Sequence, residues 1–121
     1  MLFRSGAWAE RLLQASGVAL TTTRQTLFWF WPKTPKAFRL GHFPSWFYET
    51  TPGAGFYGFP LLPGQPGIKI AEHAPGKVVT PESMDRECRD EDLEHVREAV
   101  EPFLPDGVGD LMAIKTCIYT N

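Results

Sequence analysis

Long apolar stretches and cysteine pairs are both missing from this chain of 121 residues. No run of apolar residues reaches the roughly 18 to 20 that a membrane-spanning helix needs, and the first residues lack the apolar core and cleavage site of a secretory signal. The two cysteines, Cys88 and Cys117, form no CxxC pair and have no paired histidines nearby, so neither a disulfide framework nor a zinc site is predicted. We therefore expect a cytoplasmic protein with two free thiols, no metal and no membrane contact.

The composition is typical of a single globular domain over residues 1–121, with 43% apolar and 21% charged residues. The charge is distributed unevenly. Residues 1–40 carry six basic residues and one acidic residue, whereas residues 81–121 carry four basic and eleven acidic residues. These opposite charges favour contact between the two ends of the chain. The basic first third contains no common nucleic-acid-binding motif, so we expect no nucleic-acid partner.

Residue patterns predict two helices and about five strands. Helical spacing of apolar residues marks residues 7–16, followed by Gly17 as a left-handed cap, and residues 91–103, with Asp90 as the expected N-cap. A helical turn is expected over residues 81–87. Alternating or β-branched and aromatic residues predict strands at 19–31, 43–49, 56–59, 68–73 and 111–120. The predicted fold class is α+β, a mostly antiparallel sheet of about five strands with two helices packed on one side.

The strand over residues 19–31 ends in five consecutive large apolar residues, from Leu27 to Trp31. Successive side chains of a strand point to opposite faces, so both faces of this strand need apolar cover. Two short helices supply little of it. We therefore expect a homodimer that hides the remaining surface, with a monomer whose own helices cover the strand as the alternative.

One glycine pattern imitates a nucleotide-binding motif. Gly53, Gly55 and Gly58 match GxGxxG, which binds a pyrophosphate only where the last glycine opens a helix. Three prolines at positions 60, 63 and 66 prevent a helix there. The pattern therefore predicts a hairpin turn and no nucleotide-binding half.

Two strands carry candidate functional residues. Lys69 and His73 lie four positions apart and share one face of their strand, although a lysine on an edge strand would look the same. The last strand places Lys115, Cys117 and Tyr119 on one face, together with Leu111 and Ala113. A cysteine in an apolar strand is often a small buried side chain, but a face with a cation, a thiol and a phenol is unlike a core and predicts a polar ligand.

Several motifs occur in a fixed order along the chain: Gly6-Ala-Trp8, Leu12-Leu13, Arg24-Gln25, Tyr57-Gly-Phe-Pro60, Ile68-Lys-Ile70, His73, Asp85-Arg86-Glu87 and Lys115-Thr-Cys-Ile-Tyr-Thr120. In this combination the chain resembles the sarcosine oxidase and N-methyltryptophan oxidase family. The resemblance implies that the chain is related to FAD-dependent amine oxidases of the D-amino acid oxidase type. Such enzymes transfer a hydride from the carbon next to an amine nitrogen to FAD, which oxygen regenerates with release of hydrogen peroxide.

The resemblance also implies roles for individual residues. Cys117 matches the cysteine that carries the flavin covalently through its sulfur. Lys69 matches a lysine near the flavin that helps to activate oxygen, since a fixed positive charge stabilises reduced oxygen species. Tyr57, His73 and Tyr119 are expected to line the substrate pocket.

The resemblance covers only the middle-to-late third of the family pattern. The glycine-rich FAD-binding Rossmann half and its carboxylate-binding arginine have no counterpart in the sequence. We therefore expect a substrate-domain portion of such an oxidase, truncated relative to the family, which binds no FAD and is inactive alone. Two alternatives remain open: an interaction and oligomerisation module derived from that domain, or a subunit that complements a separate FAD-binding half.

Overall fold

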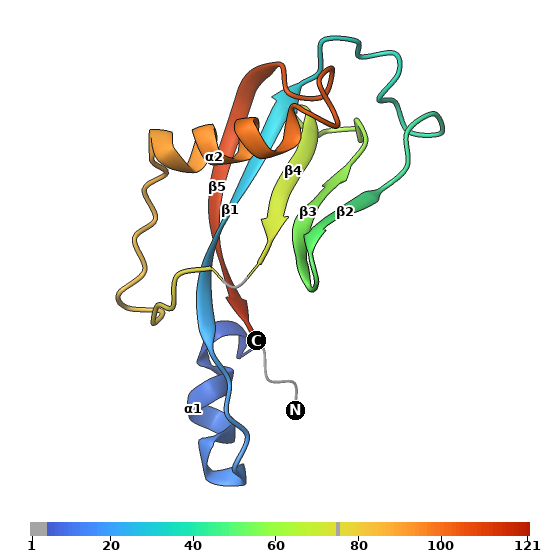
Figure 1. Cartoon of the computed structure of the whole chain (residues 1–121). Helices are drawn as coiled ribbons and strands as arrows, with labels where there is room; N and C mark the ends of the chain where they lie inside the picture. The colour runs from blue at the N-terminus through green and yellow to red at the C-terminus, as the bar shows by residue number, and fades with distance from the viewer. Residues whose placement is uncertain (1–4, 75) are drawn as a thin grey trace.

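The computed structural model describes residues 5–74 and 76–121. It contains strands β1 (Thr22–Trp31), β2 (Trp46–Thr51), β3 (Ala54–Phe59), β4 (Ile68–His73) and β5 (Asp110–Thr120). These strands form one sheet in the order β2-β3-β4-β1-β5 (Figure 1), and every neighbouring pair is antiparallel. Two α-helices, α1 (Ala9–Leu13) and α2 (Asp90–Val100), complete the fold. The predicted α+β class is therefore confirmed.

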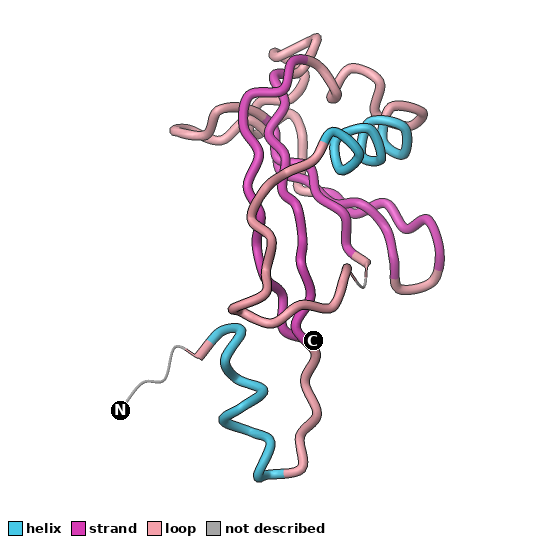
Figure 2. Tube along the Cα trace, turned by 90° about the vertical axis from the view of Figure 1, so that its left-hand side faces the viewer, coloured by secondary structure: helices cyan, strands magenta, loops and turns pink. Residues whose placement is uncertain are grey.

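Helix α2 lies across one face of the sheet (Figures 1 and 2), which we call the helix face. The core of the protein forms here, because Val96 and Val100 of α2 pack against apolar side chains from β1 and β4. The loop that leads from β1 to β2 contributes the buried Phe38. The completely buried side chains of this core include Phe30, Ile68, Ile70 and Val100, each 0% exposed. We call the opposite side of the sheet the site face.

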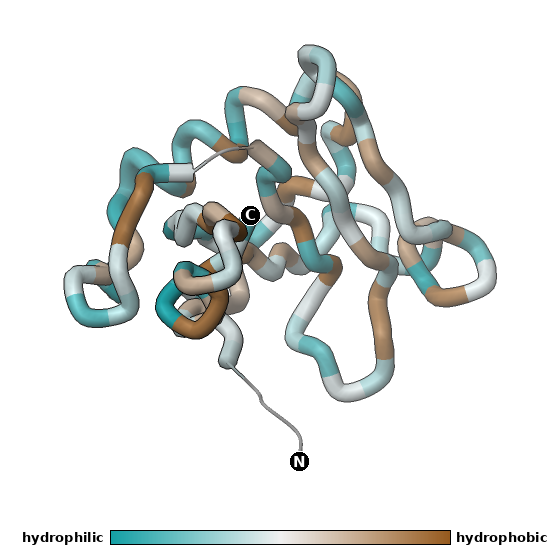
Figure 3. The backbone as a smooth tube through the Cα atoms, turned by 90° about the horizontal axis from the view of Figure 1, so that it is seen from below, coloured by the Kyte–Doolittle hydropathy of each residue, from teal (hydrophilic) through white to brown (hydrophobic). Residues whose placement is uncertain are grey.

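Helix α1 lies beyond the end of β1 and β5 rather than over the sheet (Figure 1). It is flanked by the 3-10 turns η1 (Gly6–Trp8) and η2 (Gln14–Ser16), and Gly17 ends the segment in the predicted left-handed conformation with φ 74°. None of its residues is buried, and the apolar Trp8, Leu12 and Leu13 are 46, 56 and 40% exposed. Apolar and polar residues alternate along the chain as a whole, as the hydropathy colours of Figure 3 show. No described helix is long and apolar enough to cross a membrane.

The connection from β4 to α2 differs from the predicted one. Residues 81–83 form a single turn and the following residues are extended, so the helical turn expected over 81–87 is shorter. Arg89, rather than Asp90, is the N-cap of α2. The capping carboxylate is Asp92, which accepts a hydrogen bond from the Arg89 backbone N–H at 3.1 Å. The reason is that Asp92, three residues after Arg89, can reach back to the free backbone N–H of the N-cap residue.

The glycine-rich segment forms the predicted hairpin. Gly53 has a left-handed φ of 77° in the turn between β2 and β3, and Gly55 and Gly58 lie within β3. Gly58 leaves no space for a side chain, because a Cβ atom there would lie 2.7 Å from the Trp46 ring and 2.4 Å from the Lys69 carbonyl oxygen. The spacing of these glycines therefore serves close packing of the sheet.

Ion pairs connect the basic first third of the chain with acidic residues before, within and at the end of α2. The three pairs are Arg24 with Asp92 at 2.9 Å, Lys33 with Glu101 at 3.3 Å and Arg11 with Glu82 at 2.8 Å. The predicted contact between oppositely charged ends is confirmed. Only the Arg24–Asp92 pair is shielded from solvent, with side chains 13 and 26% exposed, so the two outer pairs contribute little to stability.

The aromatic strand β1 obtains most of its cover within the chain. Its two edges are paired with β4 and β5, and Phe28 and Phe30 point into the core under α2. On the site face Leu27 is 8% exposed and Trp29 is half-buried. Trp31, at the end of the strand, remains 45% exposed.

Candidate functional site

Antiparallel pairing defines which side chains share the site face. Tyr57 of β3 pairs with Ala71 of β4, Ala71 pairs with Leu27 of β1, and Leu27 pairs with Lys115 of β5. Paired residues point to the same side of a sheet, and so do residues two positions apart in one strand. The site face therefore carries all the residues expected to line a site: Tyr57, Lys69, His73, Cys117 and Tyr119.

The phenols of Tyr57 and Tyr119 meet above the sheet. Their hydroxyl oxygens lie 2.6 Å apart, and the hydrogen bond links β3 to β5 across the two strands between them. Burial, and then the hydrogen bond with Tyr57, raise the pKa of Tyr119 to about 12. Tyr119 therefore stays protonated throughout the physiological pH range and can share its proton with Tyr57.

Lys69 is enclosed by aromatic rings on the site face. Its Nζ lies 5.0 Å from the ring centre of Tyr57 and 5.3 Å from that of Phe59, which are distances of cation–π contact. The strand β4 lies between β3 and β1. The alternative of an edge-strand lysine is therefore wrong, and Lys69 places a positive charge on a flat aromatic surface.

His73 is the last residue of β4 and is exposed. Its ring contacts the ring of Phe47 edge-on, with 5.7 Å between the centres. The imidazole is thus supported on the β2 side and open to a ligand on the other.

Cys117 is half-buried and pairs with Gln25 of β1. Lys69 pairs with Trp29, so Cys117 and Lys69 lie four register positions apart along β1, about 13 Å at the usual rise of a strand. One ligand that contacts both must span at least this distance. Cys88 lies on the opposite side of β5, with its Sγ 3.3 Å from the Thr116 hydroxyl, and does not belong to this group.

A bulge in β5 interrupts the predicted alternation of side chains. Trp29 pairs with Ala113 but the next residue, Phe30, pairs with Leu111, so Met112 is an extra residue. Because the bulge reverses the alternation, Leu111 packs against the core on the helix face. The prediction that Leu111 shares a face with Ala113 and Cys117 is therefore wrong.

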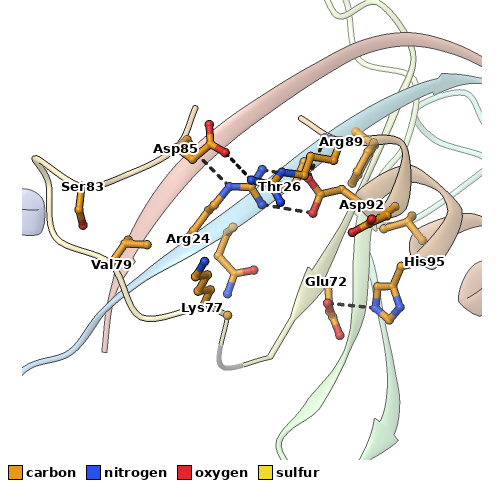
Figure 4. A pocket seen from close by; sticks show the side chains of 15 residues that line it. Arg24, Thr26, Glu72, Lys77, Val79, Ser83, Asp85, Arg89, Asp92 and His95 are labelled. Carbon is orange, nitrogen blue, oxygen red and sulfur yellow. Dashed lines mark hydrogen bonds and ion pairs between the residues drawn. The ribbon is translucent and has the colours of Figure 1, made fainter. Parts of the chain in front are cut away.

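A polar cavity of about 390 Å³ lies on the helix face, below the connection from β4 to α2 (Figure 4). Arg24 contacts both sides of it, since its guanidinium binds the Asp92 carboxylate at 2.9 and 3.2 Å and the backbone oxygens of Asp85 and Glu87 at 3.0 and 2.6 Å. The hydrogen bond from Arg24 is the main cause that lowers the pKa of Asp92. The hydrogen-bonding groups of Arg24 and Asp92 are directed at each other, which indicates a structural role.

Sequence reasoning missed three neighbours of the site: Phe47, Phe59 and Gln25. Strand alternation shows which residues of one strand share a face, but it does not show which residues of other strands lie beside them. Only the pairing of β2, β3, β4 and β1 shows that these three residues lie near His73 and Lys69. Within residues 5–74 and 76–121, no group of three His, Cys, Asp or Glu side chains is arranged to hold a metal ion.

The fold of this chain is similar to part of a solved amino acid oxidase. The structure superposes on NikD, an unusual amino acid oxidase essential for nikkomycin biosynthesis, with a TM-score of 0.62 over 95% of this chain and 30% of NikD, at 21% identity. The Tyr258Phe mutant of NikD gives the same TM-score. At this level of identity the likeness shows the fold alone.

The sequence is similar to monomeric sarcosine oxidases. It is 36% identical to that of Streptomyces avermitilis over 118 residues, which are 96% of this chain and 31% of the relative, and 32% identical to that of a Bacillus species over 120 residues. No protein-family model matches. The predicted resemblance to the sarcosine oxidase family is confirmed, and the chain spans about 30% of the length of the curated relatives it matches.

Proposed function

We propose that the site face forms the flavin- and substrate-facing wall of an amine oxidase similar to sarcosine oxidase. The observation that supports this proposal is the position of Cys117, Lys69, His73, Tyr57 and Tyr119 on one face of the sheet, although they come from three strands. The described residues form an antiparallel sheet without a βαβ unit. The proposal includes a nucleotide-binding polypeptide that completes the site, and the chain alone is expected to be colourless and inactive.

The side chains fit a flat, aromatic cofactor such as FAD. Phe59, Tyr57 and the half-buried Trp29 offer an aromatic surface. Cys117 offers a thiol that is displaced from Lys69 by about 13 Å in the direction of β1. FAD bound here would supply the hydride acceptor for oxidation of the carbon next to an amine nitrogen. Cys117 would hold it through sulfur, at the end of the face away from Lys69.

The remaining residues bind, orient and supply charge. Lys69, held by the two aromatic rings, provides the fixed positive charge that stabilises reduced oxygen species. Tyr119 keeps its proton and, with Tyr57, donates a hydrogen bond to a polar group of the substrate. His73 is exposed beside them and offers a further donor or acceptor to the same substrate.

A chimeric enzyme tests the proposal. This chain replaces the 118 matching residues of the Streptomyces avermitilis sarcosine oxidase, which supplies the rest of the polypeptide. We expect the chimera to carry covalently bound flavin after denaturation and to form hydrogen peroxide from sarcosine. Cys117→Ser should abolish covalent attachment, while the control Cys88→Ser, on the other side of β5, should retain it.

Lys69 has its own test in the same chimera. Lys69→Met should slow the reaction of the reduced enzyme with oxygen by about 10²–10³-fold, as expected for removal of one electrostatic donor. The control Lys115→Met removes the exposed lysine of the same face and should leave this rate nearly unchanged. A folded, soluble chimera without flavin, or one in which both lysine variants behave alike, would refute the proposed role of the site face.

Self-association is a second candidate function, which is favoured by exposed apolar side chains on the strands. Trp31, Phe47 and Met112 are 45, 52 and 51% exposed, and a second copy would cover them in a symmetric dimer. Light scattering of the purified chain decides this point. A mass near 13.6 kDa that does not change with concentration excludes the dimer, and twice that mass, reduced by Trp31→Glu, supports it.

A further inference from the structure

The pairing between β1 and β4 stops before β4 ends. The paired residues run from Phe30 with Ile68 to Leu27 with Ala71. β4 continues through Glu72 to His73, and these two residues pair with β3 on their other side. In the described part of the chain, His73 therefore has no ladder partner on β1.

The side chain of Gln25 occupies this gap. Gln25 is the next site-face residue of β1 after Leu27, and on its other side it pairs with Cys117. It is only 5% exposed, and its Nε2 donates a hydrogen bond of 2.7 Å to the carbonyl oxygen of Ala74, the residue after His73. A side-chain hydrogen bond thus joins the two strands where the backbone ladder has ended.

Gly76 and Lys77 are packed closely against the same part of β1. A Cβ atom on Gly76 would lie 2.1 Å from the Arg24 carbonyl oxygen and 3.0 Å from Nε2 of Gln25. The Arg24 backbone N–H also donates to the Lys77 carbonyl oxygen at 2.9 Å. The Gln25 carboxamide is therefore held between the Ala74 carbonyl oxygen and Gly76.

From this arrangement we propose that Gln25 is a positioning residue, which holds His73 at a fixed distance from Cys117 across the site face. The two residues lie on either side of β1, about 10 Å apart at the usual strand spacing. Loss of the amide donor leaves the Ala74 carbonyl without this partner, so we expect the end of β4 to move away from β1, and His73 with it, as far as the backbone hydrogen bond between Arg24 and Lys77 allows. The importance of this distance for catalysis rests on the function proposed above, but the distance itself exists without a cofactor.

The test measures the distance directly in the isolated chain. A nitroxide spin label on Cys117, in a Cys88→Ser background, enhances the NMR relaxation of nearby nuclei. We expect Gln25→Met, which keeps the side-chain length but removes the donor, to lower the enhancement at His73 and leave it unchanged at Lys69, in the paired part of β4. Gln65→Met makes the same substitution at an exposed glutamine and should change neither.

Each outcome decides the proposal. Unchanged enhancement at His73 in folded Gln25→Met overturns it, and so does an equal change at Lys69 and His73, because β4 would then move as a whole. If Gln25→Met does not fold, Gln25→Glu, which has the same shape and no donor, replaces it. Failure of both to fold would make Gln25 a purely structural residue and also overturn the proposal. A chimera without flavin, together with the expected relaxation result, would refute only the proposed function.

Discussion

The two faces of the sheet are formed by the same strands but contain different chemistry. On the helix face Phe30, Ile68 and Ile70 are completely buried under α2. On the site face Lys69 and Cys117 are half-buried, and the polar groups are directed outward or toward each other. Most of the energy of folding therefore comes from one face, which leaves the other free to bind a ligand. This division predicts that equal substitutions have unequal effects on the two faces.

The largest difference is expected between two phenylalanines. Phe30→Ala creates a cavity in the core and should lower the free energy of unfolding by about 3–5 kcal/mol. Phe47→Ala removes the same ring from β2, where it is 52% exposed, and should cost less than about 1 kcal/mol. Urea denaturation followed by circular dichroism measures both. Similar losses at the two positions would contradict the division between the faces.

The next effect concerns the shielded ion pair of the helix face. Arg24→Met removes the guanidinium that holds Asp92 and the backbone of Asp85 and Glu87. We expect a loss of about 2–3 kcal/mol at neutral pH, as for hydrogen bonds to charged groups. Lys33→Met breaks an exposed pair with Glu101 and serves as the control, with a loss below about 1 kcal/mol.

The same pair predicts the response to acid. Because Arg24 holds the pKa of Asp92 below its ordinary value, the stabilisation by Asp92 is complete at neutral pH. It is lost as the pH falls through the folded pKa, below about 4. In Arg24→Met the free energy of unfolding should fall less steeply over this acid range. A slope identical to that of the unmodified chain would show that Asp92 is not the titrating group.

On the site face the corresponding test is alkaline. Tyr57→Phe removes the hydrogen bond to Tyr119, so the pKa of Tyr119 should fall from about 12 toward 10, while burial retains part of the shift. The stabilisation that keeps Tyr119 protonated is complete below about pH 10 and is lost as the pH rises through about 12. Ultraviolet absorbance of tyrosinate measures the titration. Tyr48→Phe, at the exposed edge of the sheet, should leave the Tyr119 titration unchanged.

The smallest difference lies within the site face. Lys69→Gln removes a cation between two aromatic rings and should lower the free energy of unfolding by about 0.5–1 kcal/mol. Lys115→Gln, at an exposed position, should change it by less than about 0.5 kcal/mol. Thermal unfolding of the two variants shows which substitution is more destabilising. Greater destabilisation by Lys115→Gln would contradict the enclosure of Lys69.

The sequence was sufficient to predict the features that depend on local pattern. Alternation placed Lys69 with His73 and Cys117 with Tyr119, and the glycines and prolines after Thr51 predicted the hairpin. The order of the strands was not predictable, because no local pattern states which strand lies beside which. The Tyr57–Tyr119 hydrogen bond and the role of Gln25 depend on that order, since each connects residues more than 45 positions apart.

The charge gradient gave a second kind of information. It predicted that the first third of the chain contacts the acidic segment, but not that Arg24 would be the shielded residue among Arg11, Arg24 and Lys33. Exposure depends on where α2 packs, and α2 packs where Phe28 and Phe30 present an apolar surface. The N-cap of α2 is Arg89, one residue before the predicted Asp90. Asp92 binds both the Arg89 backbone N–H and Arg24, whereas the sequence predicted Asp90 as the N-cap.

The bulge at Met112 gives β5 one residue more than the opposite strand requires. Deletion of Met112 would join Leu111 directly to Ala113 and leave every residue from Ala113 onward with its present partner. Deletion of a single residue between Ala113 and Cys117 would instead turn Tyr119 toward the helix face. Related chains can therefore differ in length at this point of β5, whereas the Lys115-Thr-Cys-Ile-Tyr-Thr120 segment tolerates substitution more readily than a change in length.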